Sequence, residues 1–116
     1  MRTYKLINKV PVLFDDFTDK DVWKIENRRV AETKLTKDIW VSTVFLVLDH
    51  SFNPNGPVLL FESMIFGGKK DGYQARYSTW EEAEVGHKKA VDLAFKSLDK
   101  RTRCRIKRIE KQNNKT

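Results

Sequence analysis

The sequence is short of cysteine, of long apolar runs and of histidine, and these shortages exclude whole classes of protein. Its one cysteine, Cys104, cannot form an internal disulfide and has no cysteine neighbours for a metal site. Mean hydropathy is −0.60, which leaves no room for a membrane span. The apolar run from Val10 to Phe14 is short, contains Pro11 and precedes two aspartates, so it lacks the features of a signal peptide. We therefore expect an intracellular protein without disulfides.

Positive charge is concentrated at one end of the chain. The net charge is +7, yet residues 1–95 carry fourteen basic and fourteen acidic residues, whereas residues 96–116 carry nine basic and two acidic ones. At 116 residues, the length fits one α+β domain over residues 1–99, followed by a basic tail or helix extension over residues 100–116. This segment is either a solvated tail or a binding site for phosphate-rich partners. The candidate nucleic-acid-binding residues are Lys100, Arg101, Arg103, Arg105, Lys107, Arg108 and Lys111.

The middle of the chain predicts a β-meander. Residues 39–49 and 58–66 are rich in β-branched, aromatic and aliphatic residues, and the Asn, Pro and Gly of residues 50–57 predict a loop between them. The simplest pairing is an antiparallel hairpin. A strand over 29–35, after an irregular or helical start and before a turn at 36–38, would extend it to a meander. Residues 4–14 predict one short strand at the periphery.

Both central strands are apolar on both faces. Trp40, Val44, Leu46 and Leu48 alternate with Val41, Phe45 and Val47, and Leu60, Met64 and Phe66 alternate with Leu59, Phe61 and Ile65. Both faces of such a sheet favour burial, and one helix covers only one of them. We expect a homo-oligomer that buries the second face. The alternative is that residues 1–28 cover it within the monomer.

A helix start is sharply marked near residue 79. Ser78 or Thr79 can cap the helix, with Glu81 or Glu82 as the reciprocal partner, because the acidic first turn suits the helix dipole. An apolar stripe then predicts a helix that either ends at about Leu98 or continues into the basic segment. The stripe consists of Trp80, Ala83, His87, Val91, Ala94, Phe95 and Leu98. The sequence thus predicts an α+β fold, an antiparallel three- to four-stranded β-meander packed against one long C-terminal helix.

The few polar residues in these segments form a weak candidate metal site. His87 lies in the apolar stripe with Glu84 three residues before it, and Asp49, His50 and Glu62 lie on or beside the strands. Such side chains can bind a metal if they converge. A buried, hydrogen-bonded histidine is the more common structure for His87. We therefore expect no metal and no cofactor, and keep His50, Glu62, Glu84 and His87 only as weak candidates.

Aromatic residues near the loops suggest a ligand pocket. Phe52, Tyr73, Arg76 and Tyr77 are the candidate ligand-binding residues for a base or nucleotide, whereas Trp40 and Trp80 are expected in the core. Gly67-Gly68 lacks the spacing of a phosphate loop, so these glycines are expected to provide positive φ at a strand end. No serine or cysteine has a recognisable base partner, and we expect no enzyme.

Residues 28–91 resemble a family of small proteins encoded in tailed bacteriophage genomes. The resemblance lies in the order RRVAETKL, WVSTVFLVLDHSF, GPVLLFESMIFGG and RYSTWEEAEVGH. It implies a phage or prophage origin and an accessory role in the host cytoplasm, but no particular activity. Members of the family often have LGLDH where this chain has Leu46 to His50, and many end soon after the helix, so the basic segment is a feature of this chain.

Three functions are compatible with these observations. The first is a non-enzymatic phage accessory protein that binds and inhibits a host or defence factor, either a protein or a small nucleotide-like ligand. The second is a nucleic-acid-associated protein that uses Lys100 to Lys111. The third, much weaker, is a metal-dependent hydrolase.

Overall fold

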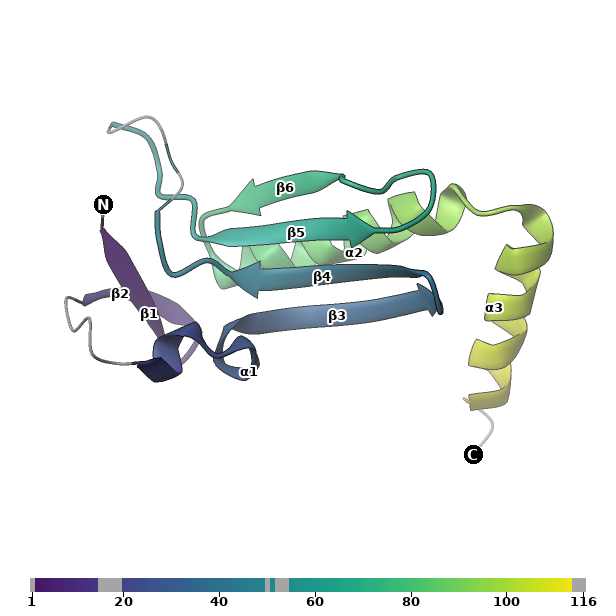
Figure 1. Cartoon of the computed structure of the whole chain (residues 1–116), viewed down its shortest axis with the longest axis horizontal. Coiled ribbons are helices and arrows are strands. Elements are labelled where there is room, and N and C mark those ends of the chain that lie inside the picture. Colours follow the sequence, from purple (N-terminus) through teal and green to yellow (C-terminus); the bar gives the residue numbers. More distant parts are fainter. Residues whose placement is uncertain (1, 15–19, 50, 52–54, 114–116) are drawn as a thin grey trace.

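A four-stranded antiparallel sheet and one long helix form the body of the protein. The computed structural model describes residues 2–14, 20–49, 51 and 55–113. Its main sheet has the strand order β3-β4-β5-β6, and helix α2 packs across it (Figure 1). This confirms the predicted α+β fold with a meander. The elements are β3 (Arg29–Thr36), β4 (Ile39–Phe45), β5 (Phe61–Phe66), β6 (Gln74–Tyr77) and α2 (Trp80–Lys96).

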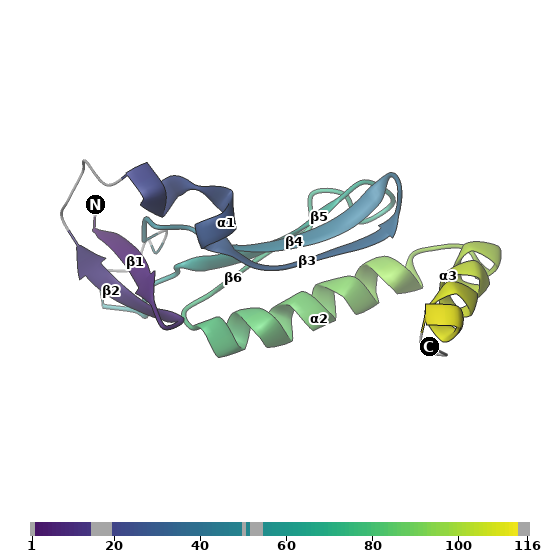
Figure 2. The ribbon, with the colours of Figure 1, turned by 90° about the horizontal axis from the view of Figure 1, so that it is seen from below.

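The two faces of this sheet have different surroundings. The register pairs Trp40 with Phe66 and Val41 with Ile65, so the predicted alternation of faces is correct within β4 and β5. It does not hold for Leu60, which precedes β5 and is buried in the same cluster as Phe61. Val41, Ile65 and their neighbours Phe45 and Phe61 are at most 1% exposed and lie on the face that α2 covers, here called the covered face. Among the described residues, the opposite face, here called the open face, has only the short helices η1 (Lys20–Trp23) and α1 (Ile25–Arg28) near one end (Figure 2).

A small N-terminal hairpin completes one end of the core. Strands β1 (Thr3–Ile7) and β2 (Val10–Phe14) pair in a sheet of their own, so the expectation of a single strand was wrong. The chain reverses at Asn8 and Lys9, whose φ angles are 52° and 69°. Two-residue turns with positive φ match the twist of a hairpin. The second residue of such a turn is usually glycine, so the lysine here did not predict a turn.

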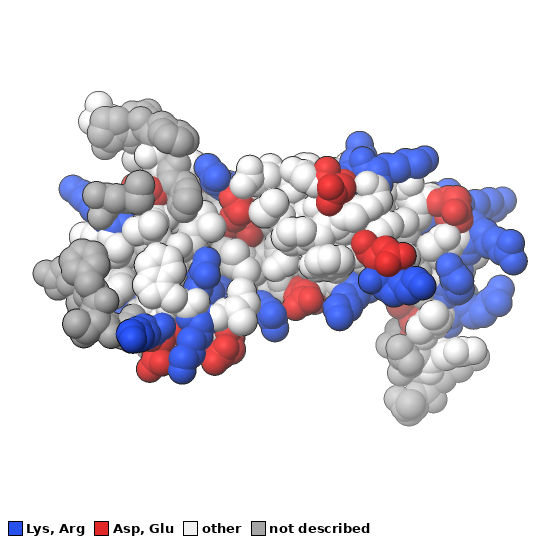
Figure 3. Space-filling view, in the orientation of Figure 1, with Lys and Arg blue, Asp and Glu red and all other residues white. Residues whose placement is uncertain are grey.

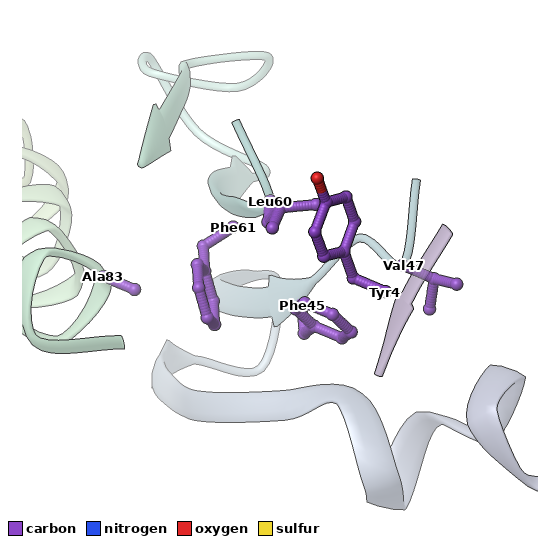
Figure 4. Close-up of a cluster of buried hydrophobic side chains, with 6 residues drawn as sticks. All are labelled: Tyr4, Phe45, Val47, Leu60, Phe61 and Ala83. Atoms are coloured by element: carbon purple, nitrogen blue, oxygen red, sulfur yellow. The ribbon is translucent and has the colours of Figure 1, made fainter. Parts of the chain in front are cut away.

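The hairpin also belongs to the core rather than to the periphery. The Tyr4 N–H donates to the Val47 carbonyl at 2.8 Å, and Tyr4 is 8% exposed. Its ring lies beside Phe45 and Leu60, while Phe61 lies between Phe45 and Ala83 of α2 (Figure 4). The first residues of the chain therefore contribute directly to the packing of the sheet end.

The central strands are shorter than their apolar runs. Strand β4 ends at Phe45 instead of Asp49 because Val47 adopts a φ of 72°, which breaks the extended backbone. Strand β5 begins at Phe61 instead of Val58. In the segment between them, the Asp49 carboxylate accepts hydrogen bonds from the backbone N–H groups of Ser51 and Leu59, at 2.9 and 3.0 Å. Asp49 therefore shapes the predicted loop.

Short helices and glycines set the remaining boundaries. Helices η1 (Lys20–Trp23) and α1 (Ile25–Arg28) precede β3, as the irregular or helical start predicted. Gly67 has a φ of 85°, and a Cβ there would lie 1.9 Å from the Asp38 carbonyl oxygen. The turn between β3 and β4 and the turn after β5 therefore approach so closely that position 67 requires glycine.

The basic segment forms a separate helix, α3 (Lys100–Asn113). Helix α2 begins as predicted, because the Thr79 hydroxyl accepts from the Glu82 N–H at 3.1 Å. It ends at Lys96, and Asp99 then caps a new helix by accepting from the Thr102 N–H at 2.7 Å. Helix α3 contacts the body sparsely, and the radius of gyration is 16.4 Å against about 13 Å for a chain of this length. It projects from the body (Figure 1). Within the described ranges, none of the helices has the length and apolar character to span a membrane.

Candidate functional site

Helix α3 presents a dense array of positive charge to solvent. Of its seven basic residues from Lys100 to Lys111, six are exposed and Arg103 is half-buried. Arg101, Arg105 and Arg108 follow the i, i+4, i+7 spacing that places side chains on one side of a helix. In the view of Figure 3, lysine and arginine side chains gather at the end of the molecule where α2 meets α3.

The remaining side of α3 faces the body. Ile106 and Ile109 line a hollow of about 590 Å³, together with Leu35 of β3 and Val91 and Phe95 of α2. The Lys107 ammonium lies 5.6 Å from the centre of the Phe95 ring, a cation–π distance. This side of α3 is therefore turned toward the body across an open hollow, in which Ile109 remains 51% exposed.

Acidic side chains leave the charge of α3 largely uncompensated. Its only acidic residue is Glu110, and Asp99 is used as the cap. The Thr102 backbone N–H lowers the pKa of Asp99, as do its hydroxyl and the nearby Arg105 and Arg101. Within the described part of the chain, the ion pairs lie in the body and none involves α3. The helix therefore keeps its charges available for a polyanion.

His87 belongs to a buried hydroxyl network on the covered face. Its Nδ1 lies 2.7 Å from Thr43 Oγ1 and its Nε2 lies 2.8 Å from Thr33 Oγ1. Thr43 Oγ1 is in turn 2.5 Å from Ser63 Oγ. Thr43 and Ser63 are fully buried and His87 is 6% exposed. Burial lowers the pKa of His87, so the imidazole is neutral at pH 7 and its two nitrogens bridge β3 and β4.

The weak metal candidates do not meet on one face. Glu62 lies on the open face, where its carboxylate accepts from Gln74 Nε2 at 2.5 Å and pairs with Arg76 Nε at 2.9 Å. His87 lies on the covered face, and Glu84 is exposed. No group of three potential metal ligands occurs among the residues whose positions are described; His50 lies outside them.

The candidate ligand-binding residues are likewise divided between the faces. Tyr73 and Tyr77 line a groove between β6 and α2, whereas Arg76 pairs with Glu62 on the open face. Phe52 lies outside the described residues. Of the two tryptophans expected in the core, Trp80 packs edge-on against Phe61, while Trp40 stacks on Phe66 on the open face.

Comparison with known protein families, curated proteins and solved structures found no match for this chain. The bacteriophage resemblance of residues 28–91 therefore stays a prediction.

Proposed function

We propose that this protein is a non-enzymatic binding protein that contacts duplex DNA through α3. The observation that supports the proposal is the exposed, projecting helix itself, with seven basic residues against one acidic residue over Lys100–Asn113. Lysine and arginine side chains that neutralise backbone phosphates release condensed counterions, which favours binding without base recognition. The expected mode is electrostatic and largely independent of sequence.

The shape of α3 favours a duplex over a membrane surface. A helix with its side chains is about 10–12 Å wide, close to the width of the major groove of B-DNA. A membrane-surface helix needs a broad apolar face, but the apolar side chains of α3 are mainly Ile106 and Ile109, which line the hollow facing the body. The basic sides are the ones left for a partner.

The polar cluster of the body favours a structural role over a catalytic one. Thr43 hydrogen-bonds to both Ser63 and His87, but Ser63 and Thr43 are fully buried on the covered face. A nucleophile must reach its substrate, and α2 covers this position. The network instead joins β3, β4 and β5 to α2.

Neutralising the exposed side of α3 tests the proposal. We expect Arg101→Gln, Arg105→Gln and Arg108→Gln together to weaken binding to a labelled DNA duplex at least tenfold at about 100 mM salt, because each lost phosphate contact reduces the number of counterions released. Glutamine has nearly the helix propensity of arginine, so the helix is retained. Fluorescence anisotropy measures the affinity and circular dichroism the helix content.

The matched control removes the same charge from the body. Arg2→Gln, Lys20→Gln and Lys24→Gln change three exposed basic residues in or beside β1 and η1, which lie at the end of the molecule opposite α3 (Figure 1). They are expected to alter the affinity less than threefold, since the Debye length at this salt is about 10 Å. Equal losses in both triple variants would argue against α3 as the site. Unchanged affinity in the α3 variant would overturn the proposal.

A second candidate function rests on the open face. Trp40 and Phe66 stack with ring centroids 5.2 Å apart, and Met64 and Val44 lie beside them, all partly exposed. The centre of this face shows few charged atoms (Figure 3). Partly exposed aromatic residues are common anchors of protein–protein contacts. This favours binding of a host or defence protein, in keeping with the accessory role in the host cytoplasm that the phage resemblance implies.

A further inference from the structure

Strand β6 leaves unpaired backbone groups at one edge of the sheet. In its pairing with β5, Ala75 faces Ser63 and Tyr77 faces Phe61. Just before the strand, the Ile65 N–H donates to the Tyr73 carbonyl at 3.1 Å. Because hydrogen-bonding direction alternates along an antiparallel strand, the N–H and C=O groups of Gln74 and Arg76 point outward. Within the described ranges, no strand lies beyond β6 (Figure 1).

The opposite edge of the sheet is irregular, whereas β6 is short but regular. Strand β3 carries two register shifts, at Arg29/Ala31 and at Lys34/Thr36, and bulges and charged residues are the usual protection of an edge strand. The pairing of β6 with β5 has no shift. The regular edge of β6 is therefore the one suited to accept another strand.

An apolar groove lies directly beside this edge. Ala75 and Tyr77 of β6, Tyr73 just before it, and Val85 and Gly86 of α2 line a hollow of about 540 Å³. Val85 is 53% exposed. A Cβ at Gly86 would lie 2.0 Å from the Tyr77 ring, so glycine allows this tyrosine to lie against α2. Covering the groove would bury apolar area together with the backbone edge.

The charges along the groove are arranged symmetrically about Val85. Glu81 and Glu82 lie at one end and Lys89 at the other. Glu81, Val85 and Lys89 follow the i, i+4, i+8 spacing on one side of α2. An antiparallel copy of α2 would place its lysine opposite Glu81 and its Glu81 opposite Lys89. The surface is therefore complementary to itself.

We propose that β6 pairs antiparallel with β6 of a second copy, about a twofold axis at Ala75, to form one continuous sheet. Gln74 of each copy then faces Arg76 of the other, and the two exchange both N–H···O bonds. Tyr73 of each copy lies opposite Tyr77 of the other, and the grooves meet. This dimer uses the sheet edge and leaves the open face free, and it does not depend on DNA binding.

Light scattering on the full chain tests the dimer. The expected mass is twice 13.7 kDa at micromolar concentration. Gln74→Pro removes an outward N–H and is expected to give a monomer. The control Gln74→Ala loses only the side-chain bond to Glu62 and should stay dimeric. Val85→Glu, which places two like charges beside the axis without altering the backbone, should also give a monomer.

A charge exchange distinguishes this dimer from other assemblies. Glu81→Lys or Lys89→Glu alone should weaken association, and the double variant should restore it, because the two positions face each other only in an antiparallel copy. In a Cys104→Ser background, Ala75→Cys should form a covalent dimer on mild oxidation, since directly opposed non-hydrogen-bonded residues lie about 4.5 Å apart.

Three results would overturn the proposal. One is a wild-type mass of one chain at every concentration up to about 100 μM. Another is a dimer that survives both Gln74→Pro and Val85→Glu but dissociates on Trp40→Glu, which would place the interface on the open face. The third is binding of a strand from a different protein at β6 while this chain remains monomeric.

Discussion

The Phe61→Ala variant is expected to lower the free energy of unfolding by about 3–5 kcal/mol, because it removes a fully buried ring and leaves a cavity. Phe61 is 0% exposed on the covered face. Its ring lies 5.4 Å from the centre of Phe45 and 6.3 Å from that of Trp80, the first residue of α2. Urea unfolding followed by circular dichroism gives the value.

Phe66→Ala is the matched control, since it changes the same residue type on the same strand but on the open face. Phe66 is partly exposed and touches Trp40, so we expect a loss of only about 1 kcal/mol. Equal losses for the two variants would mean that the open face is as well buried as the covered one, contrary to the arrangement described above.

Replacing His87 with alanine is expected to cost about 1–3 kcal/mol, from the lost hydrogen bonds and the cavity. Thr43 keeps Ser63 as a partner, but Thr33 loses the imidazole nitrogen. Metal chelators should leave the melting temperature of the wild type unchanged. A stabilisation by zinc or manganese that disappears in both His87→Ala and Glu84→Ala would show that His87 is a ligand instead.

The same histidine should make stability depend on pH in one direction. Burial lowers the pKa of His87 in the folded chain, so the unfolded chain binds a proton first as the pH falls. The free energy of unfolding should therefore stay constant above about pH 6.5 and decrease as the pH falls from there to the folded-state pKa of His87. Because His50 is the other histidine of the sequence, the comparison is made between two proteins that both carry His50→Gln. Adding His87→Gln to one of them should remove this pH dependence. An increase in stability on acidification through the same range would contradict a buried neutral imidazole.

The predictable parts of the fold are those where local pattern and tertiary environment agree. The Thr79 cap with Glu82, the turn before Ile39 and the alternation of Val41 and Phe45 against Trp40 all follow from residue type and spacing. The end of β4 was not predictable, because valine normally favours an extended strand, whereas the buried Val47 adopts a positive φ. The chain reversal at Asn8 and Lys9 lacked a glycine signal.

The candidate sites show the same division. The charge of residues 100–111 was evident from composition, but the separate helix depends on Asp99, a cap signal that the continuing apolar spacing obscured. A buried hydroxyl cluster was predictable in principle, since Thr43 and Ser63 are polar residues at inward positions of apolar strands. That Thr43 and Thr33 both bind the His87 imidazole could be known only from the strand register and the position of α2.

Nucleic-acid binding by α3 is tested most directly by its salt dependence. For the wild-type chain and a DNA duplex, raising monovalent salt from about 50 to 200 mM should weaken binding roughly a hundredfold or more if about five phosphates are contacted. The variant with Arg101, Arg105 and Arg108 changed to glutamine should show a smaller slope of log affinity against log salt. An affinity that does not change with salt, or an equal slope in both chains, would contradict electrostatic binding by α3.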